Sequence, residues 1–188
     1  MKKISFLYAS ITALFLVSCT ENVTPKPDGF LSLEYPTATY ESYVYPNCNF
    51  KFSKNQSAVI SPEEACSFKI DYPKMKASIY MNYRPVENNL TMLLKDAQKL
   101  TYNHTIKADD IQESVYEHPE KKVYGMFYRV IGDAATNVQF YATDSTKNFV
   151  VGTLYFYAKP NFDSIYPATK YIEEDMKKIM ESLEWTNK

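Results

Sequence analysis

Apolar and polar positions alternate with a period of two over residues 76–84. Ala77, Ile79, Met81 and Tyr83 fall on one side of the chain, and the residues between them are mostly polar. A period of two is typical of a β-strand that buries one face. We therefore predict a strand here, with these four side chains turned toward the core.

A four-strand meander is predicted in the second half of the chain, over residues 111–117, 123–131, 138–143 and 149–158. Its second and fourth segments are apolar on both faces, as expected of central strands that are covered on both sides. The turns between the segments are short, and short turns require antiparallel pairing. Shorter strands, separated by prolines, are predicted at residues 30–35, 40–45, 48–53 and 65–72.

Two helices are predicted from apolar residues that recur every three to four positions. The first apolar stripe consists of Leu90, Leu93, Leu94, Ala97 and Leu100, and the second of Ile172, Met176, Ile179 and Leu183. Asp163 or Ser164 is the expected cap of the second helix. Its expected solvent face consists of Glu173, Glu174, Lys177, Lys178 and Glu181, and Trp185 is expected to pin its end to the domain.

These elements predict an α+β fold in a single domain over residues 30–188. The expected architecture is a mostly antiparallel sheet with a four-strand meander flanked by two helices. Strands that are apolar on both faces need a covering layer on each side of the sheet. The layers expected are the two helices, or one helix layer and the N-terminal strands.

A different pattern begins the chain, where Lys2 and Lys3 precede an apolar run over residues 4–17. The run ends in Leu-Val-Ser followed by Cys19, which is typical of a bacterial lipoprotein signal, and it is too short for a good spanning helix. We predict that residues 1–18 are removed and that Cys19 becomes the lipidated (palmitate-bearing) first residue. Residues 19–29, which contain two prolines and a glycine, are expected to form an extended tether to the membrane.

The amino-acid composition argues against nucleic-acid binding and for a folded domain. Removing the two lysines of the signal changes the formal net charge from −1 to −3, and no basic stripe suits nucleic acid. Aromatic residues make up 15% of the chain, which is typical of a folded, strand-rich domain.

Cys48 and Cys66 remain once Cys19 is assigned to lipid. An exported chain lies in an oxidising compartment, so the pair favours a disulfide, with two free buried thiols as the alternative. No CxxC pair or nearby histidine completes a metal site, and we predict neither metal nor cofactor.

No catalytic signature is found along the chain. His104 and His118 fall in predicted loops or helix ends, and Asp109 and Asp110 are adjacent residues that point apart on a strand. No catalytic residue is predicted. The triplets at residues 144–146 and 163–165 resemble Asp-Ser/Thr-X sites of O-linked glycosylation, but they suit a turn and a helix cap equally well. Tyr40, Tyr43 and Tyr45 are expected to be the most exposed tyrosines, where they could bind sugar or peptide.

Five segments of the chain are similar to the gliding motility lipoprotein family GldD of the Bacteroidetes. They are residues 72–80, 99–109, 123–128, 139–147 and 154–161, and the resemblance as a whole covers nearly all of the mature domain. The resemblance implies a non-enzymatic component of the envelope machinery for gliding and type IX secretion. It also implies that the partners are the membrane, through the lipid on Cys19, and other motility lipoproteins or motor components.

Two other hypotheses about the function are compatible with the sequence. One is a periplasmic domain that binds a sugar, a peptide or a lipid. The other is a hydrolase with His104 beside Asp109 or Asp110. A single acid close after Cys19 favours a domain that faces the periplasm, and the choice between inner and outer membrane stays open.

Overall fold

The computed structural model describes residues 34–46, 48–102, 107–157 and 161–186. The predicted signal, Cys19 and tether lie outside these ranges. The helices are α2 (Leu90–Tyr102) and α3 (Phe162–Ser182), with short 3₁₀ turns η1 (Pro73–Met75) and η3 (Pro119–Lys121). The strands are β1 (Tyr40–Val44), β2 (Phe50–Asn55), β3 (Val59–Pro62), β4 (Ser67–Tyr72), β5 (Ala77–Pro85), β6 (Ala108–His118), β7 (Val123–Gly132), β8 (Val138–Thr143), β9 (Asn148–Phe156) and β10 (Glu184–Trp185).

The main sheet is antiparallel and has seven strands in the order β3-β4-β5-β9-β8-β7-β6. Strands β6 to β9 are the predicted meander, and β3, β4 and β5 extend it at the β9 side. The prediction of an α+β fold is therefore confirmed, with a sheet three strands wider than the meander. The face predicted for β5 is also confirmed, because Ala77, Ile79 and Met81 are buried and Tyr83 packs against the same core.

A second sheet of three strands, in the order β1-β2-β10, joins the two ends of the described chain. Trp185 of β10 lies opposite Phe50 of β2, and its indole Nε1 donates to the carbonyl of Lys122 at 2.9 Å. The prediction that Trp185 fixes the end of the last helix is confirmed.

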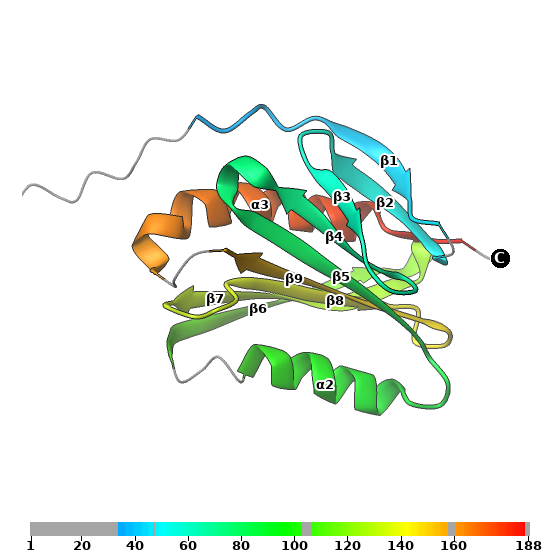
Figure 1. Ribbon diagram of the computed structural model, residues 1–188. Coiled ribbons are helices and arrows are strands. Elements are labelled where there is room, and N and C mark those ends of the chain that lie inside the picture. Colours follow the sequence, from blue (N-terminus) through cyan, green and yellow to red (C-terminus); the bar gives the residue numbers. More distant parts are fainter. Residues whose placement is uncertain (1–33, 47, 103–106, 158–160, 187–188) are drawn as a thin grey trace, which may run out of the picture. The chain divides into compact units, whose positions relative to one another are not determined.

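The two faces of the main sheet have different covers (Figure 1). On one face, α3 and the small sheet enclose the larger core, in which Phe52 and Met176 are buried together with Phe68 of the main sheet. On the other face, Leu93 and Ala97 of α2 pack against Phe149. The two predicted helices therefore cover opposite faces of the main sheet, and the N-terminal strands belong to the same layer as α3.

Several local predictions were wrong. The cap of α3 is Asn161, whose Oδ1 accepts from the Ser164 amide at 3.2 Å, so Asp163 and Ser164 already lie inside the helix. Glu34 and Tyr35 are not in a strand, and the rest of the predicted strand at residues 30–35 lies outside the described ranges. The strand β3 was missed because four residues ending in proline carry almost no alternation.

A disulfide joins Cys48 to Cys66, whose Cα atoms are 5.5 Å apart. Cys48 precedes β2 of the small sheet, and Cys66 precedes β4 of the main sheet. The bond therefore links the two sheets covalently, close to the stacked rings of Tyr45 and Phe68.

Removing this bond in the variant Cys48→Ala/Cys66→Ala is expected to lower the free energy of unfolding by about 3 kcal/mol, because a loop of this length restricts the unfolded chain. Denaturant unfolding should show the loss, and adding reductant to the wild type should reproduce it. Thiol labelling of the folded wild type without reductant should leave both cysteines unmodified. Prompt labelling of both would show that the bond does not form.

Candidate functional site

Helix α3 carries two buried acidic residues, Glu173 and Asp175, which are 0% and 1% exposed. The sequence assigned Glu173 to the solvent face of this helix, and that prediction was wrong. A buried carboxylate requires partners, because burial without them is costly. The partners of each residue define two polar clusters between the layers of the domain.

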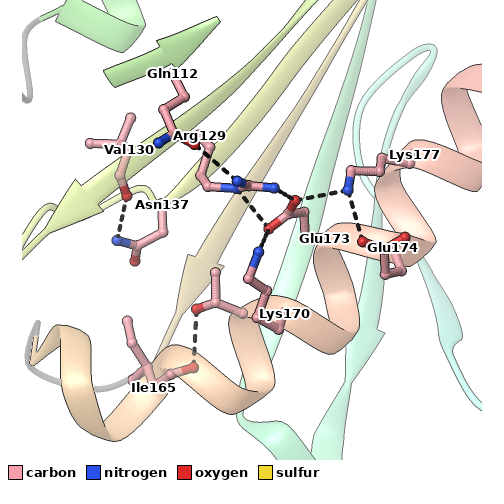
Figure 2. A network of polar contacts seen from close by, with 10 residues as sticks. Gln112, Arg129, Val130, Asn137, Ile165, Lys170, Glu173, Glu174 and Lys177 are labelled. Carbon is pink, nitrogen blue, oxygen red and sulfur yellow. Dashed lines mark hydrogen bonds and ion pairs between the residues drawn. The ribbon is translucent and has the colours of Figure 1, made fainter. Parts of the chain in front are cut away.

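The Glu173 cluster consists of Arg129, Lys170, Glu173 and Lys177 (Figure 2). Arg129 of β7 donates through Nε at 3.0 Å and through its second terminal nitrogen, so the contact is bidentate. Lys177 and Lys170 reach the same carboxylate at 3.0 and 3.3 Å from one turn away on α3. The remaining terminal nitrogen of Arg129 donates to Gln112 of β6 at 2.9 Å, so the cluster extends to the last strand of the sheet.

Electrostatics keep this glutamate charged. Burial alone would raise the pKa of Glu173, but hydrogen bonds from Arg129 and Lys177 and their positive charges hold that pKa below its usual value. The same hydrogen bond raises the pKa of Arg129. The cluster therefore acts as an ion-pair link between α3 and β7.

A groove lies beside this cluster, between β6 and α3, with a volume of about 230 Å³. It is lined by Gln112, Ser114, Val115, Tyr116, Phe127, Arg129, Lys177, Met180 and Glu181. The two basic residues in this lining already bind Glu173, so apart from the carboxylate of Glu181 the groove offers mainly apolar and neutral surface.

The Asp175 cluster consists of Tyr40, Asn55, Tyr72 and Asp175. The Tyr40 hydroxyl donates to one carboxylate oxygen at 2.6 Å, and the Tyr72 hydroxyl and the Asn55 amide donate to the other at 2.8 Å. These donors come from β1, β4 and β2, so one carboxylate on α3 ties both sheets to the helix. No salt bridge to Asp175 is found within the described ranges.

The tyrosines of the Asp175 cluster are held in the neutral form. Burial, followed by the hydrogen bond and charge of Asp175, raises the pKa of Tyr40 and Tyr72 well above their usual value near 10. Tyr72 also lines a cavity of about 510 Å³ whose surface is largely apolar. The cavity is bounded by Glu34, Tyr35, Pro36, Ser57, Val59, Tyr72, Pro73, Lys74 and Met75.

The residues proposed from the sequence for a hydrolase do not form a described site. His104 lies outside the described ranges. Asp109 and Asp110 are exposed on β6, and His118 accepts a hydrogen bond from the Lys121 amide at 3.4 Å, which caps the turn η3. Among the described residues, no group of three potential metal ligands lies together.

The Asp-Ser/Thr-X triplets have structural roles in this fold. The Asp144 carboxylate accepts from the amides of Thr146, Lys147 and Asn148 at 2.8–2.9 Å and holds the β8–β9 turn. Although burial opposes ionisation, these bonds lower the pKa of Asp144. The second triplet lies in the first turn of the helix α3.

The expected exposure of Tyr40, Tyr43 and Tyr45 was largely wrong. Tyr45 is buried and stacked on Phe68, Tyr43 packs edge-on against Phe52, and Tyr40 is bonded to Asp175. A tyrosine that does reach solvent is Tyr157, which is 57% exposed just after β9. Its hydroxyl is 2.7 Å from that of Ser78 on β5.

The fold and its clusters define an α+β domain whose two buried α3 carboxylates bridge its layers. The chain belongs to the family of the gliding motility lipoprotein GldD, whose family model matches residues 20–185. This is a motility lipoprotein family and not a known enzyme family, so membership supports a role in gliding motility and attachment to a membrane. Across the described residues, neither helix is both long and apolar enough to cross a bilayer.

Among curated proteins, none matches this chain in sequence. Among solved structures, the chain is similar to the solution structure of cyanobacterial PsbP (CyanoP) from Synechocystis sp. PCC 6803. The identity is 8% and the TM-score is 0.46, over 86% of this chain and 98% of that one. A likeness at this level carries no argument about function.

Proposed function

We propose that this chain is a non-enzymatic, lipid-anchored component of the gliding motility and type IX secretion machinery, in which it binds or stabilises other proteins of the complex. The observation that carries the proposal is the family match over residues 20–185. The lipoprotein signal that ends at Cys19 supports it, because it supplies an anchor directly before the matched region. The polar clusters around Glu173 and Asp175 are consistent with it, since their carboxylates are occupied by protein partners.

Anchoring has a physical consequence for an interaction protein. A lipid on Cys19 and a tether over residues 19–29 would confine the domain to a thin layer beside the membrane, facing the periplasm. In that layer the effective concentration of other anchored proteins is high, so weak contacts become sufficient. The partners in this proposal are therefore other membrane-bound motility or secretion proteins.

The test is a strain whose own gene carries Cys19→Ala. We expect spreading over surfaces to be lost and cross-linked motility proteins to disappear from membrane pull-downs, because the domain is no longer confined. The matched control joins residues 20–188 to the signal and cysteine of an unrelated lipoprotein, which should restore both. Normal spreading by Cys19→Ala at wild-type protein levels would contradict the proposal.

A second candidate function is a periplasmic carrier for a small apolar ligand. The cavity of about 510 Å³ beside Tyr72 favours it, because ligand sites are concave and mostly apolar. Native mass spectrometry of the purified lipoprotein would reveal a co-purified small molecule of constant mass. A variant that narrows the cavity, Val59→Trp, should then release that molecule and stop spreading if this function is the relevant one.

A further inference from the structure

Strand β6 forms one edge of the main sheet and has eleven residues (Figure 1). It pairs with β7 from Ala108 to His118, with one irregularity between Ala108 and Asp110. Within the described ranges, no strand pairs with its outer side. A long edge of this kind presents a row of backbone donors and acceptors that another chain can use.

The opposite edge of the same sheet is not equivalent. Strand β3 has four residues and ends at Pro62, which has no backbone N–H to donate. Short edge strands and edge prolines are features that prevent strand addition. The contrast singles out β6 as the edge that is open to a partner.

The charge on β6 selects the kind of partner. The strand carries Asp109, Asp110, Glu113 and Glu117 and has no lysine or arginine. A second copy paired through β6 would bring these carboxylates together, and like charges that face each other across strands are destabilising. A basic segment would bring opposite charges together.

The side chains on the two faces of β6 indicate where the basic and apolar side chains of the partner would lie. Glu113 lies on the α2 face, where it accepts a hydrogen bond from the Tyr102 hydroxyl, and Glu117, four residues further along the strand, lies on the same face. Ser114 and Tyr116 lie on the other face and line the groove with Phe127 and Met180. An added strand would therefore place basic side chains beside Glu113 and Glu117 and apolar side chains at the mouth of the groove.

We propose that the free edge of β6 binds an extended, basic segment of a partner protein by strand addition. The inference deepens the proposed function, on which it rests, by naming the surface and the chemistry of the partner. The segment alternates basic side chains on the α2 face with apolar side chains on the groove face.

The test uses the lipidated protein in detergent and a capped nine-residue peptide that alternates lysine and valine. Hydrogen exchange should slow in the fragments that cover β6 when the peptide is added, and fluorescence polarisation of the labelled peptide gives its affinity. The variant Glu113→Lys/Glu117→Lys should weaken binding at least about tenfold, because two attractive contacts on the α2 face become repulsive. The matched variant Glu64→Lys/Glu87→Lys changes the net charge equally at exposed positions outside β6 and should change the affinity less than twofold.

Two further peptides separate backbone pairing from charge. The same peptide with alternate backbone nitrogens methylated keeps its lysines and loses its donors along one edge, so it should not slow exchange at β6. A peptide with glutamate in place of lysine should not bind. Equal binding of either peptide would overturn the proposal, as would protection outside β6, or self-association of the protein through β6.

The experiments can contradict the β6 proposal and the proposed function independently of each other. If Cys19→Ala stops spreading and the lysine peptide does not bind β6, the edge inference is wrong and the proposed function stands. If the peptide binds β6 as expected and Cys19→Ala spreads normally, the proposed function is wrong. In cells, Glu113→Lys/Glu117→Lys should stop spreading at normal protein levels, whereas Glu64→Lys/Glu87→Lys should not.

Discussion

The substitution Asp175→Ala is expected to lower the free energy of unfolding by about 3–4 kcal/mol. It removes the acceptor shared by the hydroxyls of Tyr40 and Tyr72 and the amide of Asn55, two of which are almost fully buried. A buried donor that loses its acceptor retains the full cost of leaving water. Because the cluster joins α3 to both sheets, the loss affects three elements together, and urea denaturation measures it directly.

Two variants control this prediction. Asp175→Asn keeps one acceptor oxygen and the same volume, so it should cost about half as much. Glu174→Ala removes an exposed carboxylate one residue away and should change stability by less than about 0.5 kcal/mol. A cost below about 1 kcal/mol for Asp175→Ala would show that the cluster does not hold the layers together.

The substitution Arg129→Met is expected to cost about 2–3 kcal/mol, because the buried Glu173 loses its bidentate partner and retains only two partly exposed lysines. Removing both charges in Arg129→Met/Glu173→Leu should recover most of that stability, since a well-packed apolar pair replaces ions without leaving a lone charge. The double-mutant cycle, measured by chemical denaturation, gives the coupling energy. A double variant less stable than either single variant would refute this account.

The same cluster predicts a dependence on pH. The pKa of Glu173 is lowered in the folded state, so its contribution is fully present above the unfolded value near 4.3 and is lost as pH falls through the folded value. The difference in stability between wild type and Arg129→Met should therefore be constant from about pH 6 to pH 8 and shrink below about pH 4.

Lys170→Met, which removes an exposed cation from the same carboxylate, should lower the free energy of unfolding by less than about 1 kcal/mol at neutral pH.

The sequence predicted the helices and strands better than it predicted which strands pair with each other. A period of two identified β5, and a period of about three and a half residues identified both helices, because each of these elements buries one continuous face. The meander was identified from apolar segments separated by short turns. The order of strands beyond the meander did not follow from periodicity, since the pairing of β5 with β9 joins residues about seventy positions apart. The short strands β3 and β10 were missed because neither has enough residues to show a period.

The buried acids illustrate a different limit. Glu173 stands between Lys170 and Lys177 on α3, and that spacing is typical of exposed helix pairs. One signal was present elsewhere, because Arg129 interrupts the apolar run of β7 and a charge in such a strand needs a buried partner. Asp175 had no comparable signal, since its partners are neutral residues on three strands that only the fold brings together.

The prediction that Tyr40, Tyr43 and Tyr45 are exposed was largely wrong for a related reason. Alternation in β1 and β2 shows that two faces exist, but it does not show which face meets another sheet. The small sheet closes over the stacked rings of Phe50, Phe52 and Phe68. Tyr45 enters the same stack, so part of the expected exposed set belongs to the core.

The disulfide also determines how the domain would respond to a pulling force. In a motility apparatus, load between a lipid on Cys19 and a partner bound elsewhere would enter the described part of the fold through residues 34–39 and then β1. Peeling this strand would release at most about 30 Å of chain, from Tyr40 to Cys48, at roughly 3.4 Å per residue. Beyond that point the force would bypass β2 and pass through Cys66 into the seven-stranded sheet, so the bond would act as a mechanical stop that limits how far the anchored end can unravel.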